Sequence, residues 1–364
     1  MIIMALDHVR DFFHTGAQLF QPDDLTRTTA AIFLTRWATH FCAPVFMLTA
    51  GVSAWLWQRS ARATPRQLSL FLIRRGFWLV LLDVTALRFG MDFTFQAPLV
   101  ILNVLWALGW SMVLLAFLSR LPRRGLITLS IAVIALHNLT DSLRGGWLWK
   151  LLHQPGPIQI GSYTLIPGYP LIPWFAVMAL GFCAGPIFDW TVKERRRWLI
   201  RTGAFATSGF LLLRVANVYG DPAPWRGTIL SFLRVSKYPP SLEFLLMTLG
   251  PALLLLAWLE YRGSNPAGPL VTFGRVPLFY FLGHFYLAHL VALLLAQWRY
   301  GQAGFALHAT PSMGSPAGLY PSGYGYSLGS VYVIWPGIVI AMYPLCAWFG
   351  RYKRTHAFAW LRYF

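Results

Sequence analysis

Residues 241–259 read SLEFLLMTLGPALLLLAWL, and this stretch decides the class of the protein. It carries a single charged side chain, Glu243. A run of about 18 apolar residues is long enough to cross the ~30 Å hydrocarbon core of a bilayer as a helix, because each helical residue adds about 1.5 Å. We therefore predict a transmembrane helix here.

About ten apolar stretches of this kind run through the chain. Their predicted bounds are 1–13, 30–57, 68–88, 97–118, 125–139, 170–188, 198–214, 241–259, 271–297 and 328–350. The composition agrees, because 57% of the residues are hydrophobic and 12% are charged, against roughly 25% charged residues in soluble domains. The predicted fold is all-α: a polytopic integral membrane helix bundle that forms one domain over residues 1–364.

Basic side chains gather in every second connection between these stretches. They are Arg59, Arg62 and Arg66; Arg120, Arg123 and Arg124; Lys193, Arg195, Arg196 and Arg197; and Arg351, Lys353, Arg354 and Arg362. The positive-inside rule places these connections and both termini in the cytoplasm, and the opposite loops 14–29, 89–96, 140–169, 215–240 and 298–327 outside. We expect a multi-pass protein of the cell inner membrane.

The net charge of +18 has a membrane explanation. Lys and Arg between helices attract the anionic lipids of the cytoplasmic leaflet, so membrane lipids are expected partners. The sequence shows no basic surface module interleaved with aromatic residues, and nucleic-acid binding is therefore not expected.

The first stretch is short and charged, reading DHVRDFFH over residues 7–14. At 100° per residue, Asp7, Arg10, Asp11 and His14 share one helical face, whereas His8 points elsewhere. A His within one turn of a carboxylate can serve as a general base; the alternative is a cap of ordinary ion pairs at the membrane interface. With about 20 Å of length, this helix is expected to be truncated at its amino-terminal half.

Other ionisable groups fall inside the apolar stretches, where they cost several kcal/mol unless they find a partner or a cavity. Arg36 and His40 lie four residues apart and are expected to form the polar wall of a cavity, unless Arg36 extends to the interface. Pro44 follows them and is expected to break the helix there. His284 lies near mid-membrane, one turn after Tyr280, as a functional group or as a neutral histidine between helices. Asp83 needs a partner, for which Arg36 or Arg75 is expected.

Three further interpretations concern groups near the ends of the apolar stretches. Glu243 is expected to pair with Lys237 or Arg234. Arg74 and Arg75 either receive the phosphates of a cytoplasmic nucleotide-like cofactor or serve only the positive-inside pattern. Asn103 is expected to bond across helices.

The sequence carries no metal signature. Paired histidines at helical spacing with an intervening Glu are absent, and so are cysteine pairs, so we expect no metal site. Walker and dinucleotide-binding glycine patterns are absent as well.

Several short motifs, taken in order, resemble the heparan-α-glucosaminide N-acetyltransferase-like family of transmembrane acyltransferases, in its bacterial branch. The segments are Met4–His14, Thr39–Phe46 with Ala50-Gly51, Leu102–Trp110, Lys237–Ser241 and Phe273–His284. Together they cover most of the chain. The resemblance implies one transmembrane acyltransferase-like domain and an acetyl-CoA-dependent acetyltransferase that acts on an extracytoplasmic sugar or glycan.

The resemblance also implies roles for individual residues. His14 matches the catalytic His of the family's first helix, Asp7 most nearly matches an Asn of that helix, and Gly283-His284 matches a late Gly-His pair. His14 would be base or acyl carrier, oriented by Asp7 or Asp11. The expected donors to the developing oxyanion are His40, Asn103 or His284. The expected groups for the coenzyme A phosphates are Arg74, Arg75 and Arg124. Members of the family often form dimers, so a homodimer is a further expectation.

Two alternatives from other classes stay open at this point. Polar residues in broken helices also suit a transporter or flippase that binds a polar solute without acyl chemistry. A structural membrane subunit without a site is disfavoured by the density of His, Asp and Arg inside the spans. Consumption of acetyl-CoA separates the first alternative from the acyltransferase.

Overall fold

The computed structural model describes residues 1–263, 268–307, 310–312, 318–356 and 358–363, and for 359 and 362 the backbone alone. Parts of the predicted outer loop 298–327, namely 308–309 and 313–317, therefore lie outside the described residues. The chain forms two compact units, Met1–Cys42 with Thr85–Pro98 and Asn265–Phe364, and Ala43–Val84 with Leu99–Ser264. A single domain over residues 1–364 stays a prediction.

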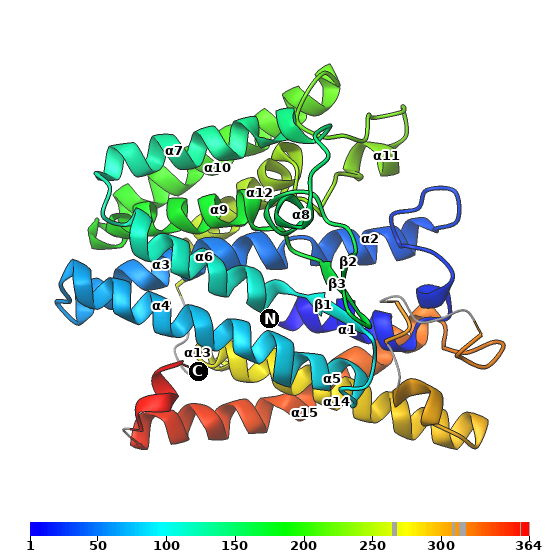
Figure 1. Cartoon of the computed structure of the whole chain (residues 1–364). Coiled ribbons are helices and arrows are strands. Elements are labelled where there is room, and N and C mark those ends of the chain that lie inside the picture. The colour runs from blue at the N-terminus through cyan, green and yellow to red at the C-terminus, as the bar shows by residue number, and fades with distance from the viewer. Residues whose placement is uncertain (264–267, 308–309, 313–317, 357, 364) are drawn as a thin grey trace. The chain divides into compact units, whose positions relative to one another are not determined.

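The first unit is built around its amino-terminal helix. Its helices are α1 (Ile2–Phe13), α2 (Ala30–Thr39), α5 (Arg88–Asp92), α13 (Pro269–Arg275), α14 (Pro277–Tyr300) and α15 (Leu328–Thr355), with the short helices η1 (Thr15–Gln18), η5 (Gly304–Leu307) and η6 (Ala359–Tyr363). Helix α1 packs against α2, α14 and α15 (Figure 1). The indole nitrogen of Trp335 in α15 donates to the carbonyl of Ile2 at 2.9 Å, which fixes the start of α1.

The second unit holds most of the remaining helices. They are α3 (Cys42–Ser60), α4 (Pro65–Leu82), α6 (Val104–Leu118), α7 (Arg123–Leu136), α8 (Trp147–Leu152), α9 (Leu171–Ala184), α10 (Val192–Ala216), α11 (Ile229–Leu233) and α12 (Leu242–Arg262), with η3 (His137–Thr140) and η4 (Gly185–Asp189). A π-helical turn, η2 (Asp83–Leu87), follows α4. The main packed pairs are α4 with α6, α6 with α9, α7 with α9, and α10 with α12.

Glycines set the closest helix approaches in this unit. A Cβ on Gly51 of α3 would lie 1.9 Å from the carbonyl oxygen of Met178 in α9, and one on Gly181 would lie 2.0 Å from the carbonyl oxygen of Leu48. Without a strong hydrophobic drive between helices in lipid, small residues at the contact let backbones approach and pack. Any larger residue at these positions forces the helices apart.

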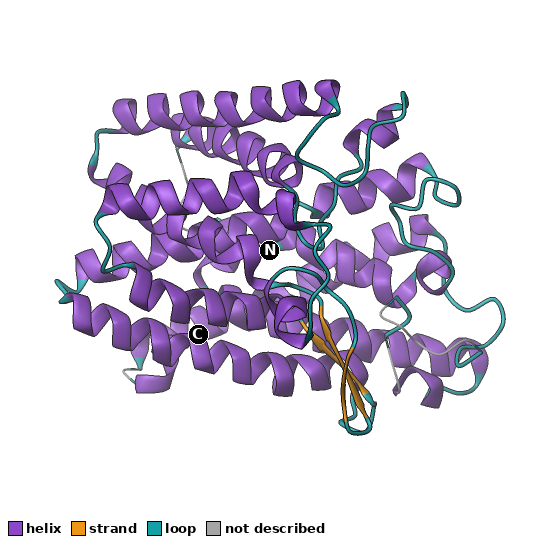
Figure 2. Cartoon of the chain, turned by 45° about the horizontal axis from the view of Figure 1, so that its top comes forward, coloured by secondary structure: helices purple, strands orange, loops and turns teal. Residues whose placement is uncertain are grey.

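A small sheet interrupts the helical pattern, and the sequence did not predict it. Its strands are β1 (Leu99–Leu102), β2 (Ile158–Ile160) and β3 (Tyr163–Pro167), in the order β1-β3-β2. β1 pairs parallel to β3, and β2 pairs antiparallel to β3 (Figure 2). The predicted span 97–118 is therefore a strand followed by a helix that begins only at Val104.

The structure confirms an all-α polytopic membrane protein. Each of the predicted apolar stretches contains helix, and six helical segments of the described residues are long and apolar enough to cross a bilayer: Ala30–Ser60, Leu171–Asp189, Val192–Ala216, Leu242–Arg262, Pro277–Tyr300 and Leu328–Thr355. The total of about ten spans stays a prediction, because α1, α4, α6 and α7 do not meet the same length and hydropathy requirement.

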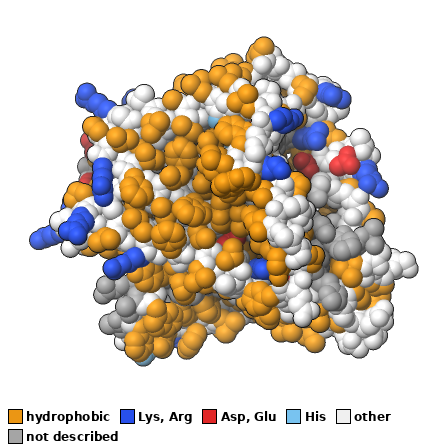
Figure 3. Space-filling model, in the orientation of Figure 1, with side chains coloured by type: hydrophobic (Ala, Val, Ile, Leu, Met, Phe, Trp, Pro, Cys, Tyr) orange, Lys and Arg blue, Asp and Glu red, His pale blue; other side chains and the backbone are white. Residues whose placement is uncertain are grey.

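Large apolar side chains remain exposed on these segments. Phe205 and Leu212 of α10 are 79% and 72% exposed, and Val333 and Ile340 of α15 are 75% and 70% exposed. Figure 3 shows hydrophobic side chains over much of the visible face. Surfaces of this kind are explained by contact with lipid rather than with water.

Candidate functional site

The charged face of α1 forms a buried ion cluster. Asp7, Arg10 and Asp11 all lie below the surface. The Arg10 guanidinium donates from Nη2 to Asp11 Oδ1 at 2.5 Å and lies 3.0 Å from Asp7 Oδ1. Spacings of three and four residues bring side chains together on a helix, which confirms the shared face read from the sequence.

Arg36 of α2 completes this cluster by pairing with the second oxygen of Asp7. Two carboxylates and two guanidiniums then balance in charge. A buried ion is tolerated only when it is paired and hydrogen-bonded, so the contact also ties α2 to α1. Arg36 is therefore paired within the protein, and its place in a cavity wall stays a prediction.

His14 follows directly after α1 and is held in place on both sides. Its Nδ1 accepts a hydrogen bond from the Gly16 N–H at 3.0 Å and caps the short helix η1. The flanking backbone is fixed by Tyr326, whose N–H donates to the Phe13 carbonyl at 2.7 Å and whose carbonyl accepts from Thr15 at 3.1 Å. The side chain is 7% exposed.

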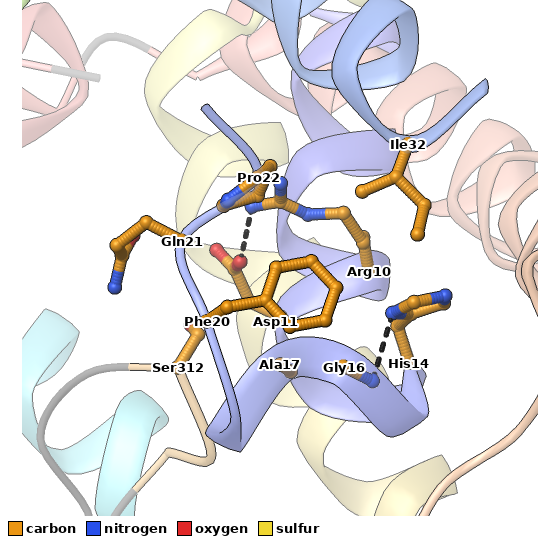
Figure 4. Close-up of a pocket in the computed structure, with 10 residues that line it drawn as sticks. All are labelled: Arg10, Asp11, His14, Gly16, Ala17, Phe20, Gln21, Pro22, Ile32 and Ser312. Atoms are coloured by element: carbon orange, nitrogen blue, oxygen red, sulfur yellow. Dashed lines mark hydrogen bonds and ion pairs between the residues drawn. The ribbon is translucent and has the colours of Figure 1, made fainter. Parts of the chain in front are cut away.

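A small pocket opens beside this histidine. Arg10, Asp11 and His14 line it together with the apolar Phe20 and Ile32 (Figure 4). In this view the dashed lines join Arg10 to Asp11 and Gly16 to His14. The pocket combines apolar walls with a few converging polar groups, as small-molecule sites do, but it is smaller than the roughly 300–1,000 Å³ of a typical ligand site.

Burial lowers the pKa of His14 below its ordinary value, and the nearby Arg10 cation lowers it further. Both effects disfavour the imidazolium. His14 is therefore neutral at pH 7, as a base or a nucleophile must be.

His8 does not point away from the cluster, in contrast to the prediction. Its Nδ1 lies 3.8 Å from Asp11 Oδ2, and its ring packs on Phe285 and His284 of α14 with centroid distances of 4.1 and 5.2 Å. The reason is that Asp11 follows His8 by three residues, which is within reach along a helix.

His284 belongs to the same unit but packs near the middle of α1. It contacts His8, which precedes His14 by six residues, or about 9 Å of helix rise. Its Nδ1 lies 2.9 Å from the Tyr280 carbonyl. A carbonyl only accepts, so Nδ1 carries the proton and Nε2, buried without a hydrogen-bond partner in the described structure, presents a lone pair.

His40 lies at the break between α2 and α3. Helix α2 ends at Thr39, α3 begins at Cys42, and His40 is 5% exposed. Pro44, four residues on, has no N–H to bond the His40 carbonyl, and its ring would collide with that carbonyl in a continuous helix. The apolar segment Ala30–Ser60 is thus broken at a buried polar residue, as expected from Pro44.

The residues predicted to hold the cofactor all lie in the second unit. Arg74 and Arg124 are exposed, and Arg75 lies over the Phe71 ring at 5.9 Å. The Asn103 side chain donates to the Ile101 carbonyl at 3.0 Å, within its own segment. Their roles stay predictions.

Two predicted ion pairs are wrong, and in both cases long-range packing supplies a different partner. Asp83 accepts from the Asn103 N–H at 2.8 Å and so receives the amino-terminal end of α6, where free N–H groups and the helix dipole favour a carboxylate. Glu243 pairs with Arg214 at 3.0 Å. Arg214 was not predicted as a partner, because it lies near the end of an ordinary apolar span.

A second group of polar residues was also overlooked. His137, Asp141 and His153 bring their ligand atoms within 4.8 Å of one another in the second unit. The spacing His-x3-Asp between positions 137 and 141 was the available signal; the third member comes from a separate helix end.

Comparison with known proteins decides the family. The chain matches the family described as heparan-alpha-glucosaminide N-acetyltransferase, catalytic, over residues 3–213. The chain belongs to this family. A search of curated proteins found no match.

For a heparan-alpha-glucosaminide N-acetyltransferase family member, the position of the matched region is informative. It contains the ion cluster of α1, His14 and His40, and it also contains Arg74, Arg75, Asn103 and Arg124. His284 lies beyond it. The family and the apolar helices together indicate a multi-pass membrane acetyltransferase.

Proposed function

We propose that the protein transfers an acetyl group from cytosolic acetyl-CoA to an extracytoplasmic sugar or glycan, with His14 as base or acyl carrier. The observation that carries the proposal is His14 itself. It is neutral, buried and fixed by Gly16 and Tyr326, and it lines a pocket beside the Arg10–Asp11 pair. Nine of the ten residues that line this pocket lie in the segment that matches the acetyltransferase family, and the tenth, Ser312, lies beyond it.

In direct transfer, His14 takes the proton of the acceptor amine or hydroxyl. The acceptor nitrogen or oxygen attacks the thioester carbon, the C–S bond breaks, and coenzyme A leaves as a thiolate that is then protonated. In the two-step route, an imidazole nitrogen of His14 attacks the thioester carbon, the C–S bond breaks, and coenzyme A leaves as a thiolate that takes up the imidazole proton. The acceptor then attacks the acetyl carbon, the bond from that carbon to the imidazole breaks, and the imidazole takes the acceptor's proton. Both routes need the neutral ring.

The hydrogen bond from Gly16 decides which tautomer of the neutral His14 ring is present before the reaction. Because the Gly16 N–H donates to Nδ1, the neutral ring carries its proton on Nε2. Reaction at Nδ1 therefore requires the substrate to replace the Gly16 N–H. Reaction at Nε2 requires a change of tautomer. The cap on η1 thus couples this short helix to the reactivity of His14.

The other predicted residues receive distinct roles in this proposal. Asp7 and Asp11 both pair with Arg10 and hold its guanidinium beside His14. His40 and Asn103 remain the proposed oxyanion donors; His284 in its neutral form offers a lone pair at Nε2 and is a weaker candidate. Arg74, Arg75 and Arg124 are proposed to bind the phosphates of coenzyme A, so their alanine variants should raise KM for acetyl-CoA more than they lower kcat.

Release of free coenzyme A from acetyl-CoA tests the function. Purified protein in nanodiscs is given acetyl-CoA with and without a panel of amino sugars and glycans. The informative variant is His14→Asn, because the amide oxygen of Asn can still accept the Gly16 N–H while the base is lost. His356→Ala is the matched control, since His356 is exposed near the carboxyl terminus.

Acceptor-dependent release that is present in wild type and His356→Ala and lost in His14→Asn supports the proposal. Full activity in a folded His14→Asn protein excludes His14 as base or carrier. No release with any acceptor, together with no binding of acetyl-CoA, favours the alternative of a transporter or flippase for a polar solute.

The proposed orientation places both termini in the cytoplasm of an inner membrane, so that acetyl-CoA approaches from the side of the basic loops. A cysteine introduced in the 120–124 loop should then react only with a reagent supplied from the cytoplasm. Labelling from outside contradicts the orientation and the proposed coenzyme site. Binding to anionic lipids and pairing into a homodimer belong to the same proposal.

A further inference from the structure

Three side chains outside the acetyltransferase site meet at one point of the second unit. His137 opens the short helix η3 that follows α7, Asp141 closes that helix, and His153 follows α8. One ligand atom from each lies within 4.8 Å of the other two, with His153 Nε2 and Asp141 Oδ1 3.0 Å apart. A search of the described residues finds this as the single cluster of three such groups.

The nitrogen atoms of this cluster are buried and largely unused. His137 is 5% exposed, and neither of its ring nitrogens has a hydrogen-bond partner in the described structure. His153 is 1% exposed, and its Nδ1 also lacks one. Buried polar atoms are nearly always satisfied by a hydrogen bond, because each one left unpaired costs free energy of folding. A ligand that accepts nitrogen lone pairs would remove this cost.

The carboxylate of the cluster is already oriented by neighbours. Asn138 donates from Nδ2 to Asp141 Oδ2 at 2.8 Å, and its own Oδ1 accepts from the Leu242 N–H at 2.9 Å. This leaves Asp141 Oδ1 turned toward His153. Trp149 packs edge-on to the His153 ring with centroids 5.2 Å apart. Such outer contacts are what fix the direction of metal ligands in proteins.

We propose that His137, Asp141 and His153 form a binding site for one divalent transition-metal ion of the zinc class. Two imidazoles and a carboxylate are a preferred donor set for zinc and a poor one for magnesium or calcium. Ligand atoms about 2.0–2.1 Å from a tetrahedral metal lie about 3.3 Å from one another. The Asp141–His153 separation already fits, and His137 closes the site by moving about 1.5 Å or less toward them.

Three protein ligands leave the fourth tetrahedral position to water or to another small ligand. The ion would join the end of α7 to the end of α8 and hold the segment 137–153 as one piece. This inference does not rest on the proposed acetyl transfer, because none of the three residues belongs to the His14 pocket.

Metal content of the full-length protein tests the site. Protein purified through a tag without histidines is stripped with EDTA, reloaded with Zn²⁺ and analysed by mass spectrometry for bound zinc. Co²⁺ serves as the second probe, because a tetrahedral cobalt site with nitrogen and oxygen ligands absorbs in the visible. The variants are His137→Ala and Asp141→Asn, with His14→Asn and His356→Ala as controls whose histidines lie elsewhere.

Support is one zinc per chain in wild type and both controls, and at least a tenfold weaker affinity in His137→Ala and Asp141→Asn. Asp141→Asn keeps the shape of the side chain, so its metal-free form should elute and melt like wild type even if His137→Ala folds poorly. Wild-type protein that binds no stoichiometric zinc at micromolar free concentration overturns the proposal. Equal affinity in wild type and Asp141→Asn overturns it as well.

Discussion

Two buried arginines in this protein are bonded in opposite ways. Arg214 is enclosed by backbone: its guanidinium donates to the carbonyls of Ala223, Ser231, Phe232 and Arg234 and to the Glu243 carboxylate. Arg10 donates to the Asp11 side chain and forms an ion pair with Asp7 at 3.0 Å, and its Nη1 is buried without a hydrogen-bond partner in the described structure. Arg10 also lines the pocket beside His14.

The difference separates a structural charge from one available for function. Arg214 donates hydrogen bonds to backbone carbonyls of the segment 217–241, and all three of its guanidinium nitrogens are used. Arg10 retains an unused donor beside a neutral histidine. Buried charges with incomplete bonding in a pocket are the ones that function employs.

The largest effect is expected from Arg214→Met. The substitution leaves Glu243 buried without its cation and four carbonyls without their donor, which costs about 3–5 kcal/mol. Thermal melting in detergent, followed by size-exclusion chromatography, should show a much lower midpoint and a large aggregated fraction. Glu243→Gln is the milder control. A variant that melts like wild type would show that the backbone contacts do not depend on Arg214.

Arg10→Met should affect catalysis more than folding. Arg36 still pairs with Asp7, and Asp11 keeps His8 at 3.8 Å. Because no backbone carbonyl loses its donor, the loss of stability should be smaller than for Arg214→Met. Coenzyme A release per folded molecule should fall about tenfold or more, equivalent to about 1.4 kcal/mol in the barrier. If Arg10→Met left turnover unchanged and lowered stability as much as Arg214→Met, both arginines would have a purely structural role.

The pH dependence of coenzyme A release sharpens the comparison. Burial and Arg10 hold the pKa of His14 below 6.5, so the acidic limb of the wild-type profile should fall below pH 6.5. Arg10→Gln removes a cation and should move that limb to higher pH. The stability of the fold should change with pH in the same direction as the activity. Between the lowered pKa of folded His14 and 6.5, the unfolded chain binds more protons than the folded one, so His14 lowers the free energy of unfolding as the pH falls. A limb that does not move in Arg10→Gln separates Arg10 from His14.

The smallest effect is expected from the exposed ion pair of Arg59 and Asp189. These side chains are 61% and 47% exposed and lie 3.1 Å apart. Water and salt screen such a pair, so Arg59→Gln should change stability by less than about 1 kcal/mol. Melting at low and high salt checks this. If Arg59→Gln lowered the melting midpoint as much as Arg214→Met, the exposure of an ion pair would not determine how much it contributes to stability.

The sequence predicted the charged face of α1 correctly because that face depends only on helical spacing. Arg10 and Asp11 follow Asp7 by three and four residues, and any helix brings side chains at these spacings together. His14 was identified by the same reasoning and by the resemblance to the family. The break at His40 likewise followed from one residue, Pro44.

Partners that come from distant segments were predicted poorly. An arginine was the predicted partner of Asp83, but its carboxylate accepts a hydrogen bond from the Asn103 N–H at the start of α6. Glu243 was assigned a basic residue of the preceding loop and binds Arg214. Within a bilayer a buried carboxylate can be satisfied by a cation or by free backbone N–H groups, and the sequence does not say which is nearer.

The sequence by itself determined that the protein is a helical membrane protein, because length and hydropathy of each span are local properties measured against the bilayer. It also determined which residues share a helical face. Tertiary structure alone decided that His137 and Asp141 meet His153, and that α3 meets α9 at Gly51 and Gly181. These contacts depend on how close backbones approach and on where irregular segments end, and no period in the sequence records either distance.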